Sequence, residues 1–420
     1  LSSVGRAAFV AVLVSLGTAR ASASESLADL VAYTLEQNVD IEALRAQVDA
    51  LEHEEVRAGA WKDPLMTIGY QNVPATSLSL GDDPMSMLAA RIGQEIPFFG
   101  KTRRRKRVAR FATEAARWKT EEKALQIGAL VKRLYYELGL TRQLRAITAE
   151  HVGLIERLLD AVRIKYEVGQ ADQHDVLRLE VLRDRLKDDL NDYIAEDRQL
   201  TALMNQTLHR EAMTSIATPE EFEIPDLSHS VDSLRRIAIE SRPALSQLDA
   251  VVGQHEAAAD LARYETIPDP TVFVQYGARS RLDNRLAGDD LITVGLSWRL
   301  PVFYRARNRA SAESAAAKAL SAKARKAALL DEIGSGLEHA LAGWERAAQK
   351  IETYRDHLVP NAHRVLDATF TSYQVDRADF LSLFEAELDL LNFEKALRIT
   401  AVDLLVAQAR VESIIGKDSP

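Results

Sequence analysis

The 420-residue sequence contains no cysteine. This absence excludes disulfide bonds, thiolate metal sites, a cysteine nucleophile and a lipid anchor attached through an N-terminal cysteine. Glycine and proline are also sparse, with 19 and 12 residues, and the net charge is −9. Such a composition argues against intrinsic disorder and against a general nucleic-acid-binding protein. We therefore expect an ordered chain with no nucleic acid among its partners.

Motifs that would carry enzyme chemistry are missing as well. The sequence has no phosphate-binding loop, no nucleophile elbow and no recognisable catalytic triad. Its nine histidines include no His-x-x-x-His pair, and there are only five methionines. These absences predict a protein that is not an enzyme, with no catalytic residue, no cofactor and no metal site built from its own side chains.

The one long apolar run lies at the N-terminus. Arg6 precedes the apolar residues 7–14, and the small residues Ala19, Ala21 and Ala23 follow. This order is typical of a secretory signal peptide, which we predict over residues 1–23; a buried N-terminal helix is the alternative. No other run approaches the ~18 apolar residues of a membrane-spanning helix. We expect an exported protein without a helical membrane anchor.

Two similar segments indicate that the chain is one module written twice. Residues 166–172 (YEVGQAD) and 373–379 (YQVDRAD) interrupt long helical patterns 207 residues apart. Asp-Pro pairs at 63–64 and 269–270 repeat at nearly the same offset. A spacing that recurs at several landmarks is the signature of an internal repeat. We predict a first repeat over 24–208, a connector over 209–232 and a second repeat over 233–420.

Each repeat is predicted to hold a lead-in helix, two strands and a long helical hairpin. No proline occurs between residues 101 and 166, so this helix would span ~100 Å at ~1.5 Å per residue. The fold class is mainly α with a smaller β part. The expected elements are helix 26–60, strands 65–73 and 87–96, helix 101–166 and a return helix after Gly169, then helix 234–251, strands 271–278 and 290–300, helix 304–373 with a kink at Pro360, and helix 379–415.

The strands suit a membrane barrel, because apolar residues alternate with small or polar ones. A soluble two-sided sheet would give the same alternation, but four such strands in an exported chain favour contact with outer-membrane lipid. Four strands cannot close a barrel, so chains must pool them: two give eight strands and three give twelve. Small polar groups on the inner faces favour the twelve-stranded barrel of a homotrimer. The lipid-facing residues of the last strand are Ile292, Val294, Leu296, Trp298 and Leu300.

The segments around Asp63-Pro64 and Gln94-Glu95-Ile96-Pro97-Phe98-Phe99-Gly100-Lys101 resemble those of the TolC-like outer-membrane efflux proteins, the outer membrane factors, and most of all their heavy-metal branch of the CzcC and CusC type. The resemblance implies a trimeric barrel continued by a periplasmic α-helical barrel of coiled-coil hairpins. It also implies a passive duct in the outer membrane of a Gram-negative bacterium, carrying heavy-metal cations from an RND-type pump and its adaptor, a membrane fusion protein. The alternatives are a periplasmic adaptor or a structural coiled-coil protein; an adaptor would show one hairpin flanked by glycine-rich β modules.

The resemblance also assigns roles to the two turns. The tip residues that would dock the adaptor are Val168, Gly169, Gln170, Ala171, Val375, Asp376, Arg377 and Ala378. The residues that would ring the periplasmic entrance are Asp175, Ser382 and Glu385, with Ser382 in place of an aspartate found in some relatives. Helix capping is the alternative role for acidic residues here, and we favour it for Asp172 and Asp379. Asp376 replaces a usual glycine and is expected to disfavour a left-handed turn.

A basic run follows the second strand, and a shorter one follows the fourth. The first comprises Lys101, Arg103, Arg104, Arg105, Lys106, Arg107 and Arg110, and the second Arg305, Arg307 and Arg309. Both runs would lie where a barrel meets the periplasm, close to anionic headgroups. A solvated first helical turn is the alternative for each.

Overall fold

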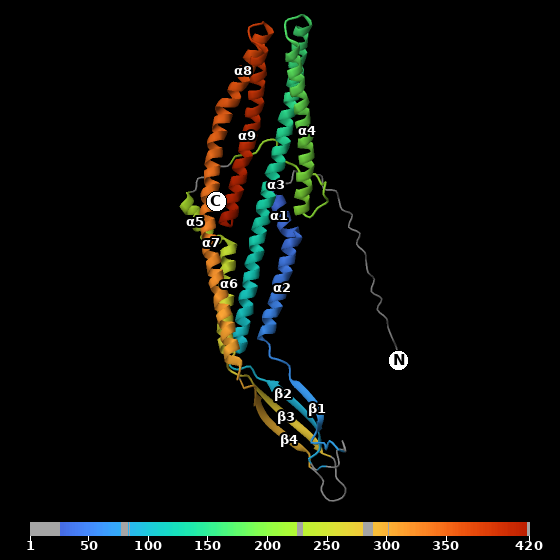
Figure 1. Ribbon diagram of the computed structural model, residues 1–420, viewed down its shortest axis with the longest axis vertical. Helices are drawn as coiled ribbons and strands as arrows, with labels where there is room; N and C mark the ends of the chain where they lie inside the picture. Colours follow the sequence, from blue (N-terminus) through green and yellow to red (C-terminus); the bar gives the residue numbers. More distant parts are fainter. Residues whose placement is uncertain are drawn as a thin grey trace, which may run out of the picture.

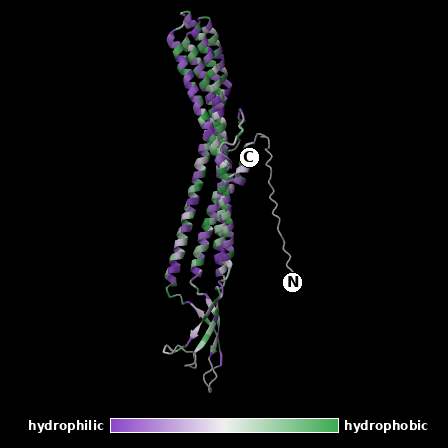
Figure 2. Ribbon diagram, turned by 90° about the vertical axis from the view of Figure 1, so that its right-hand side faces the viewer, coloured by the Kyte–Doolittle hydropathy of each residue, from purple (hydrophilic) through white to green (hydrophobic). Residues whose placement is uncertain are grey.

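The computed structural model describes residues 26–76, 83, 85–224, 230–279, 289–300 and 302–417, so the predicted signal peptide lies outside the described residues. The chain is elongated, with a four-stranded sheet at one end and two helical hairpins reaching the other (Figure 1). The predicted class, mainly helical with a small β part, is confirmed. Hydrophobic and hydrophilic residues interleave along the helices (Figure 2), as expected for helices that bury one face.

The long helices begin and end close to the predicted positions. Helix α3 (Lys101–Glu167) has 67 residues and runs from the sheet to the far tip, a length of ~100 Å. The helix α4 (Gln173–Thr207) returns along α3 for about half of that distance. The second hairpin comprises α7 (Tyr304–Thr353), a π-helical turn η1 (Tyr354–Leu358), α8 (Val359–Gln374) and α9 (Phe380–Ile415).

The kink expected at Pro360 takes the form of the π-helical turn. Proline lacks an N–H group, and its ring collides with the carbonyl four residues earlier, which here belongs to Asp356. The wider turn over Tyr354–Leu358 lies directly before Pro360 and contains that carbonyl. A π-helical segment is a known way to absorb such a defect without ending the helix.

The lead-in helices differ from the prediction, because each is broken in two. The first half of the chain has α1 (Leu27–Gln37) and α2 (Val39–Gly59), and the second half has α5 (Val231–Ser241) and α6 (Pro243–Tyr264). The Asn38 side chain caps α2 through the N–H of Asp40 at 3.0 Å and also donates to the Thr207 carbonyl, 3.0 Å away. Between α5 and α6 Pro243 enforces the break, since proline disfavours a helical residue before it.

Different helices pack against the two halves of α3. The helices α2 and α6 pack against the sheet-proximal half of α3, and α4 and α9 pack against its distal half (Figure 1). The largest buried apolar cluster joins α3, α4, α8 and α9 near the tips and includes Ile155, Leu158, Leu179 and Leu383. Two smaller clusters are separate from it: one joins α5, α7 and α9, and the other joins α1, α3 and α4.

The sheet is antiparallel, with strand order β1 (Leu65–Gln71), β2 (Met87–Glu95), β3 (Pro270–Arg279) and β4 (Leu291–Trp298). Its register places apolar residues in continuous rows across one face. One such row runs Met66, Ile92, Val274, Val294, and the neighbouring row on the opposite face runs Thr67, Arg91, Gln275, Thr293. The alternation read from single strands therefore extends over the whole sheet.

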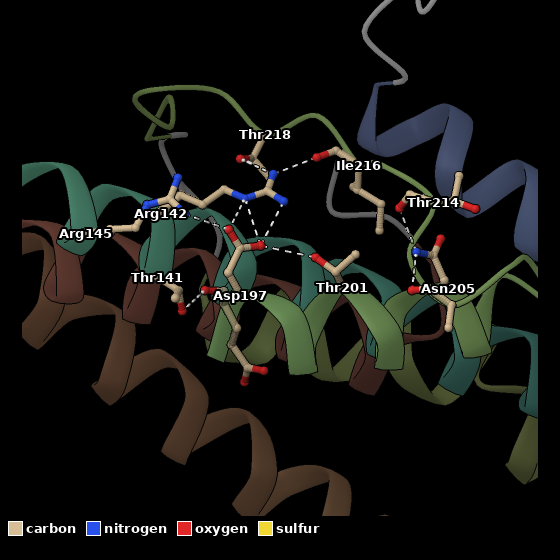
Figure 3. A network of polar contacts seen from close by, with 11 residues as sticks. Thr141, Arg142, Arg145, Asp197, Thr201, Asn205, Thr214, Ile216 and Thr218 are labelled. Carbon is tan, nitrogen blue, oxygen red and sulfur yellow. Dashed lines mark hydrogen bonds and ion pairs between the residues drawn. The ribbon is translucent and has the colours of Figure 1, made fainter. Parts of the chain in front are cut away.

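A polar network fastens the start of the connector to the first hairpin (Figure 3). Arg142 of α3 donates to Asp197 of α4 at 3.0 Å, to the Ile216 carbonyl at 2.6 Å and to the Thr218 hydroxyl at 3.1 Å. Burial alone would raise the pKa of Asp197, but the hydrogen bonds and charge of Arg142 lower it. The network thus fixes the connector against both helices of the hairpin.

The connector then crosses towards the second hairpin. The Phe222 ring packs on Gly139 of α3, where a Cβ atom would lie 2.3 Å from the ring, and it stacks edge-on against Tyr136. Glu221 pairs with Arg398 of α9. Residues 209–224 therefore form a strap that holds α9 and the first hairpin together at mid-height of the bundle.

Candidate functional site: the two helical tips

Both hairpins reverse direction with the same backbone geometry. In the first tip the N–H of Gln170 donates to the carbonyl five residues earlier at 2.7 Å, and in the second the N–H of Arg377 does so at 2.9 Å. In each tip the residue directly before the donor has a left-handed backbone, with φ of 74° at Gly169 and 59° at Asp376. This hydrogen bond across a left-handed residue is the Schellman arrangement that ends a helix.

The left-handed turn forms at Asp376 although the usual glycine is missing. Aspartate tolerates this conformation because its short polar side chain can find a local partner. Here the partner comes from the other tip, since Lys165 of α3 pairs with the Asp376 carboxylate and donates to the Tyr373 carbonyl at 2.7 Å. Asp376 therefore joins the two tips of one chain.

Most of the predicted docking residues are at the surface. Val168 and Val375 are 65% and 58% exposed. Ala171 and Ala378 are half-buried and pack against the apolar cluster of the hairpins. The exposed members of the set are Val168, Gly169, Gln170, Val375, Asp376 and Arg377.

The predicted entrance residues have unequal surroundings. Ser382 and Glu385 are exposed on the first turns of α9, whereas Asp175 is buried on the first turn of α4. The Asp175 carboxylate contacts His174 Nε2 at 3.0 Å. It also lies close to Tyr373, whose pKa is raised by burial and by the charges of Asp175 and Asp376. Asp175 therefore lies close enough to the second tip for its charge to act on Tyr373.

The capping roles predicted for two aspartates have different outcomes. Asp379 caps α9, because its carboxylate accepts from the Ser382 N–H at 2.9 Å. Asp172 occupies the equivalent position before α4 but makes no side-chain capping bond, so that prediction is wrong. Instead its carboxylate approaches His174, and Asp172, His174 and Asp175 offer atoms within 4.8 Å of one another. Two of these three side chains are exposed, and we assign them no ion.

A buried polar cluster behind the tips was not predicted. His151 of α3 is 3% exposed and lies between two glutamates of α9, with Nδ1 2.7 Å from Glu387 and Nε2 2.9 Å from Glu394. Glu394 also contacts His363 of α8 at 3.0 Å. A sequence signal existed, because His151 occupies a core position one helical turn before Ile155. Its partner, 236 residues away, could not be deduced.

The residues predicted to face lipid lie at the opposite end of the molecule. All five are between 55% and 73% exposed, and those within β4 project from the apolar face of the sheet. Among the described residues, no helix is long and apolar enough to cross a membrane.

A family model named "Outer membrane efflux protein" matches residues 30–205 and 234–417. The chain belongs to this family. The match covers most of the sequence and leaves out only the termini and residues 206–233. This membership argues against the alternative interpretations as a periplasmic adaptor or a structural coiled-coil protein.

Solved structures of outer-membrane proteins, several of them channels, share the fold of this chain. VceC from Vibrio cholerae is 17% identical, with 93% of this chain and 96% of that chain covered at a TM-score of 0.78. CusC is 14% identical over 94% and 93%, with a TM-score of 0.78. The open state of MtrE from Neisseria gonorrhoeae is 15% identical over 94% and 89%, with a TM-score of 0.76. Comparison with curated protein sequences gives no match.

Proposed function

We propose that three copies of this chain form a passive outer-membrane duct of a tripartite efflux system. The observation that carries the proposal is that the two ends of the molecule differ. One end is a sheet with one apolar face, and the other end, ~100 Å away, consists of two tips with exposed apolar residues. The sheet suits lipid, and the tips suit a partner reaching from the inner membrane. The matching left-handed turns at Gly169 and Asp376 support a tandem duplication.

The edges of the sheet support an assembly of several chains. Within the described residues, β1 and β4 each pair on one side only, and unpaired edges cannot remain in lipid. Three copies would pool twelve strands into one barrel with an open lumen. We expect chemical cross-linking of the purified protein in mild detergent to end at three chains. A ladder that ends at two chains, or monomers alone, would refute the trimer.

The entrance is proposed to lie at the tips, with Asp175, Ser382 and Glu385 lining it and the tip residues docking an adaptor. The double variant Asp175→Asn/Glu385→Gln would remove six negative charges from a trimer while keeping side-chain size. Because a ring of carboxylates attracts cations, we expect the preference for cations over anions in planar bilayers to fall by about twofold.

The matched control is Asp49→Asn/Asp331→Asn, which removes equally many charges from exposed positions on α2 and α7, remote from the tips. This variant should conduct like the unaltered protein. If the entrance variant also conducts unchanged, the constriction lies elsewhere.

Gly169→Val should instead weaken adaptor binding and leave conductance intact, because a β-branched residue disfavours φ of 74°.

Heavy-metal cations are the proposed cargo, on the strength of the sequence motifs that resemble the CzcC and CusC type. Cells that lack this protein should become sensitive to Zn²⁺, Co²⁺ or Cu⁺ and should regain tolerance when it is restored. Sensitivity confined to organic dyes or detergents would contradict the metal cargo and leave the duct itself standing.

A further inference from the structure

The polar face of the sheet carries an arginine without an acidic partner at its centre. This residue, Arg91, is the middle residue of β2. The register places two other charged side chains on the same face, Glu95 and Arg279, at opposite ends of the sheet. Glu95 pairs with Lys62 at 2.8 Å, and Arg279 donates to the Asp289 carbonyl at 2.7 Å. Within the described part of the chain, Arg91 forms neither an ion pair nor a side-chain hydrogen bond.

The side chain of Arg91 lies on an aromatic ring. Its guanidinium carbon is 3.4 Å from the centroid of the Phe273 ring. That ring lies over Gly295 of β4, where a Cβ atom would approach it to 2.5 Å. The direct neighbour of Phe273 on β2 is Gly93, so the ring has a glycine beside it on both adjacent strands. A guanidinium that stacks on a ring keeps the N–H groups at its edge available for an anion.

We propose that Arg91 forms a positively charged ring inside the barrel, which attracts anions and repels cations. The polar face of the sheet is the face that would line the aqueous lumen, and three chains would bring three copies of Arg91 to one level of that lumen. Rings of arginine or lysine side chains are a known basis of anion preference in pores. The inference rests on the proposed function for the trimer and for the lumen.

The Arg91 ring has the opposite charge to the carboxylates proposed at the entrance, and ~100 Å of helix separates the two. Each ring raises the local concentration of ions of the other sign. A voltage that drives cations from the tips towards the sheet makes each type of ion enter through the ring that attracts it, so the conductance rises. The reverse voltage makes each type enter through the ring that repels it. The duct would therefore pass cations outward more readily than inward.

The test measures the reversal potential of the purified full-length trimer in planar bilayers across a KCl gradient near ~0.1 M. The entrance variant Asp175→Asn/Glu385→Gln serves as the background, so that the barrel dominates the selectivity. We expect Arg91→Gln to lower the preference for chloride over potassium about threefold, because three charges ~10 Å from the axis act over about one Debye length. Arg91→Lys keeps the charge and should retain most of the preference. At ~1 M KCl the difference should disappear, since the Debye length falls to ~3 Å.

The asymmetry of the current provides a second measurement, made without the entrance variant. Protein added to one side of the bilayer inserts with its tips on that side, because the polar helical bundle cannot cross the hydrocarbon layer. We expect the unaltered duct to carry more current when the side of the tips is positive. Arg91→Gln should lose most of this difference between the two polarities.

Arg235→Gln is the matched control, because Arg235 is exposed on α5, at mid-height of the bundle and far from the sheet (Figure 1). This variant should change neither the selectivity nor the asymmetry. Unchanged selectivity in Arg91→Gln, or an equal shift in the control, would overturn the inference. A shift that persists at ~1 M KCl would also overturn it, because a change in pore shape would then be the cause. Trimers that conduct with unchanged selectivity would refute only the ring, whereas trimers that do not conduct would refute the duct and the ring together.

Discussion

Replacing His151 with leucine is expected to lower the free energy of unfolding by about 3–5 kcal/mol, the usual cost of removing one partner from a buried ion pair. The imidazole contacts Glu387 and Glu394, and Glu387 is almost completely buried. Leucine would leave both carboxylates without the group they share. Because the cluster joins α3 to α9 and, through His363, to α8, the two hairpins of one chain would also separate more easily.

The contribution of His151 to stability is expected to depend on pH. Burial alone would lower the pKa of His151, but its hydrogen bonds to Glu387 and Glu394 outweigh burial and raise it to about 9. The folded chain therefore holds this proton more tightly than the unfolded chain, where the ordinary value is 6.5. The stabilisation is complete below pH 6.5 and is lost as the pH rises through 9. Thermal unfolding should show this loss in the unaltered protein and not in His151→Leu.

Two further variants make the result specific to the buried cluster. His53→Leu alters an exposed histidine of α2 and should leave both the stability and its pH dependence unchanged. The double variant His151→Leu/Glu387→Leu should recover part of the lost stability, because it also removes one stranded carboxylate. A loss below ~1 kcal/mol in His151→Leu would mean that the cluster does not hold the hairpins together.

Local patterns were enough to predict the long elements. Helix 101–166 was expected from an uninterrupted apolar period without proline, and α3 spans Lys101–Glu167. The strands were found with similar accuracy, because alternation and bounding turn residues are also local signals. The break at Asn38 was missed, since its side chain is held by Thr207, far along the chain. A polar residue within a helical pattern does not indicate that its side chain bonds to a distant segment.

At the tips, too, local features could be predicted from the sequence and contacts between the hairpins could not. The positions of the two turns were predictable from two similar heptapeptides, but the left-handed conformation of Asp376 and the link between the tips were not. Lys165 meets Asp376 across 211 residues, and the contact exists only because the two hairpins pack side by side. The proximity of Asp175 to Tyr373, 198 residues further along the chain, likewise arises from the packing of the two hairpins. Pairings between helices follow from tertiary packing, which the period of a single helix does not contain.

Arginine at Val294 should block membrane insertion, whereas arginine at the preceding residue, Thr293, should be tolerated. Val294 is 70% exposed at the centre of β4 and continues the apolar row of Met66, Ile92 and Val274. If this row faces lipid, a charge there costs ~2–4 kcal/mol near the bilayer midplane. Thr293 projects from the other face, in the row that already contains Arg91, so a further arginine would face the aqueous lumen.

The two variants differ by one position along the same strand and introduce the same side chain, so general effects of arginine on synthesis or export cancel between them. The measurement is the fraction of each protein recovered as trimer from outer membranes after a urea wash. We expect Thr293→Arg to resemble the unaltered protein and Val294→Arg to be largely absent. Equal losses would show that the apolar face is buried against protein, and equal recovery would show that the sheet does not enter the hydrocarbon layer. The difference between neighbouring residues therefore tests the membrane assignment directly, because side chains on a strand alternate between its two faces.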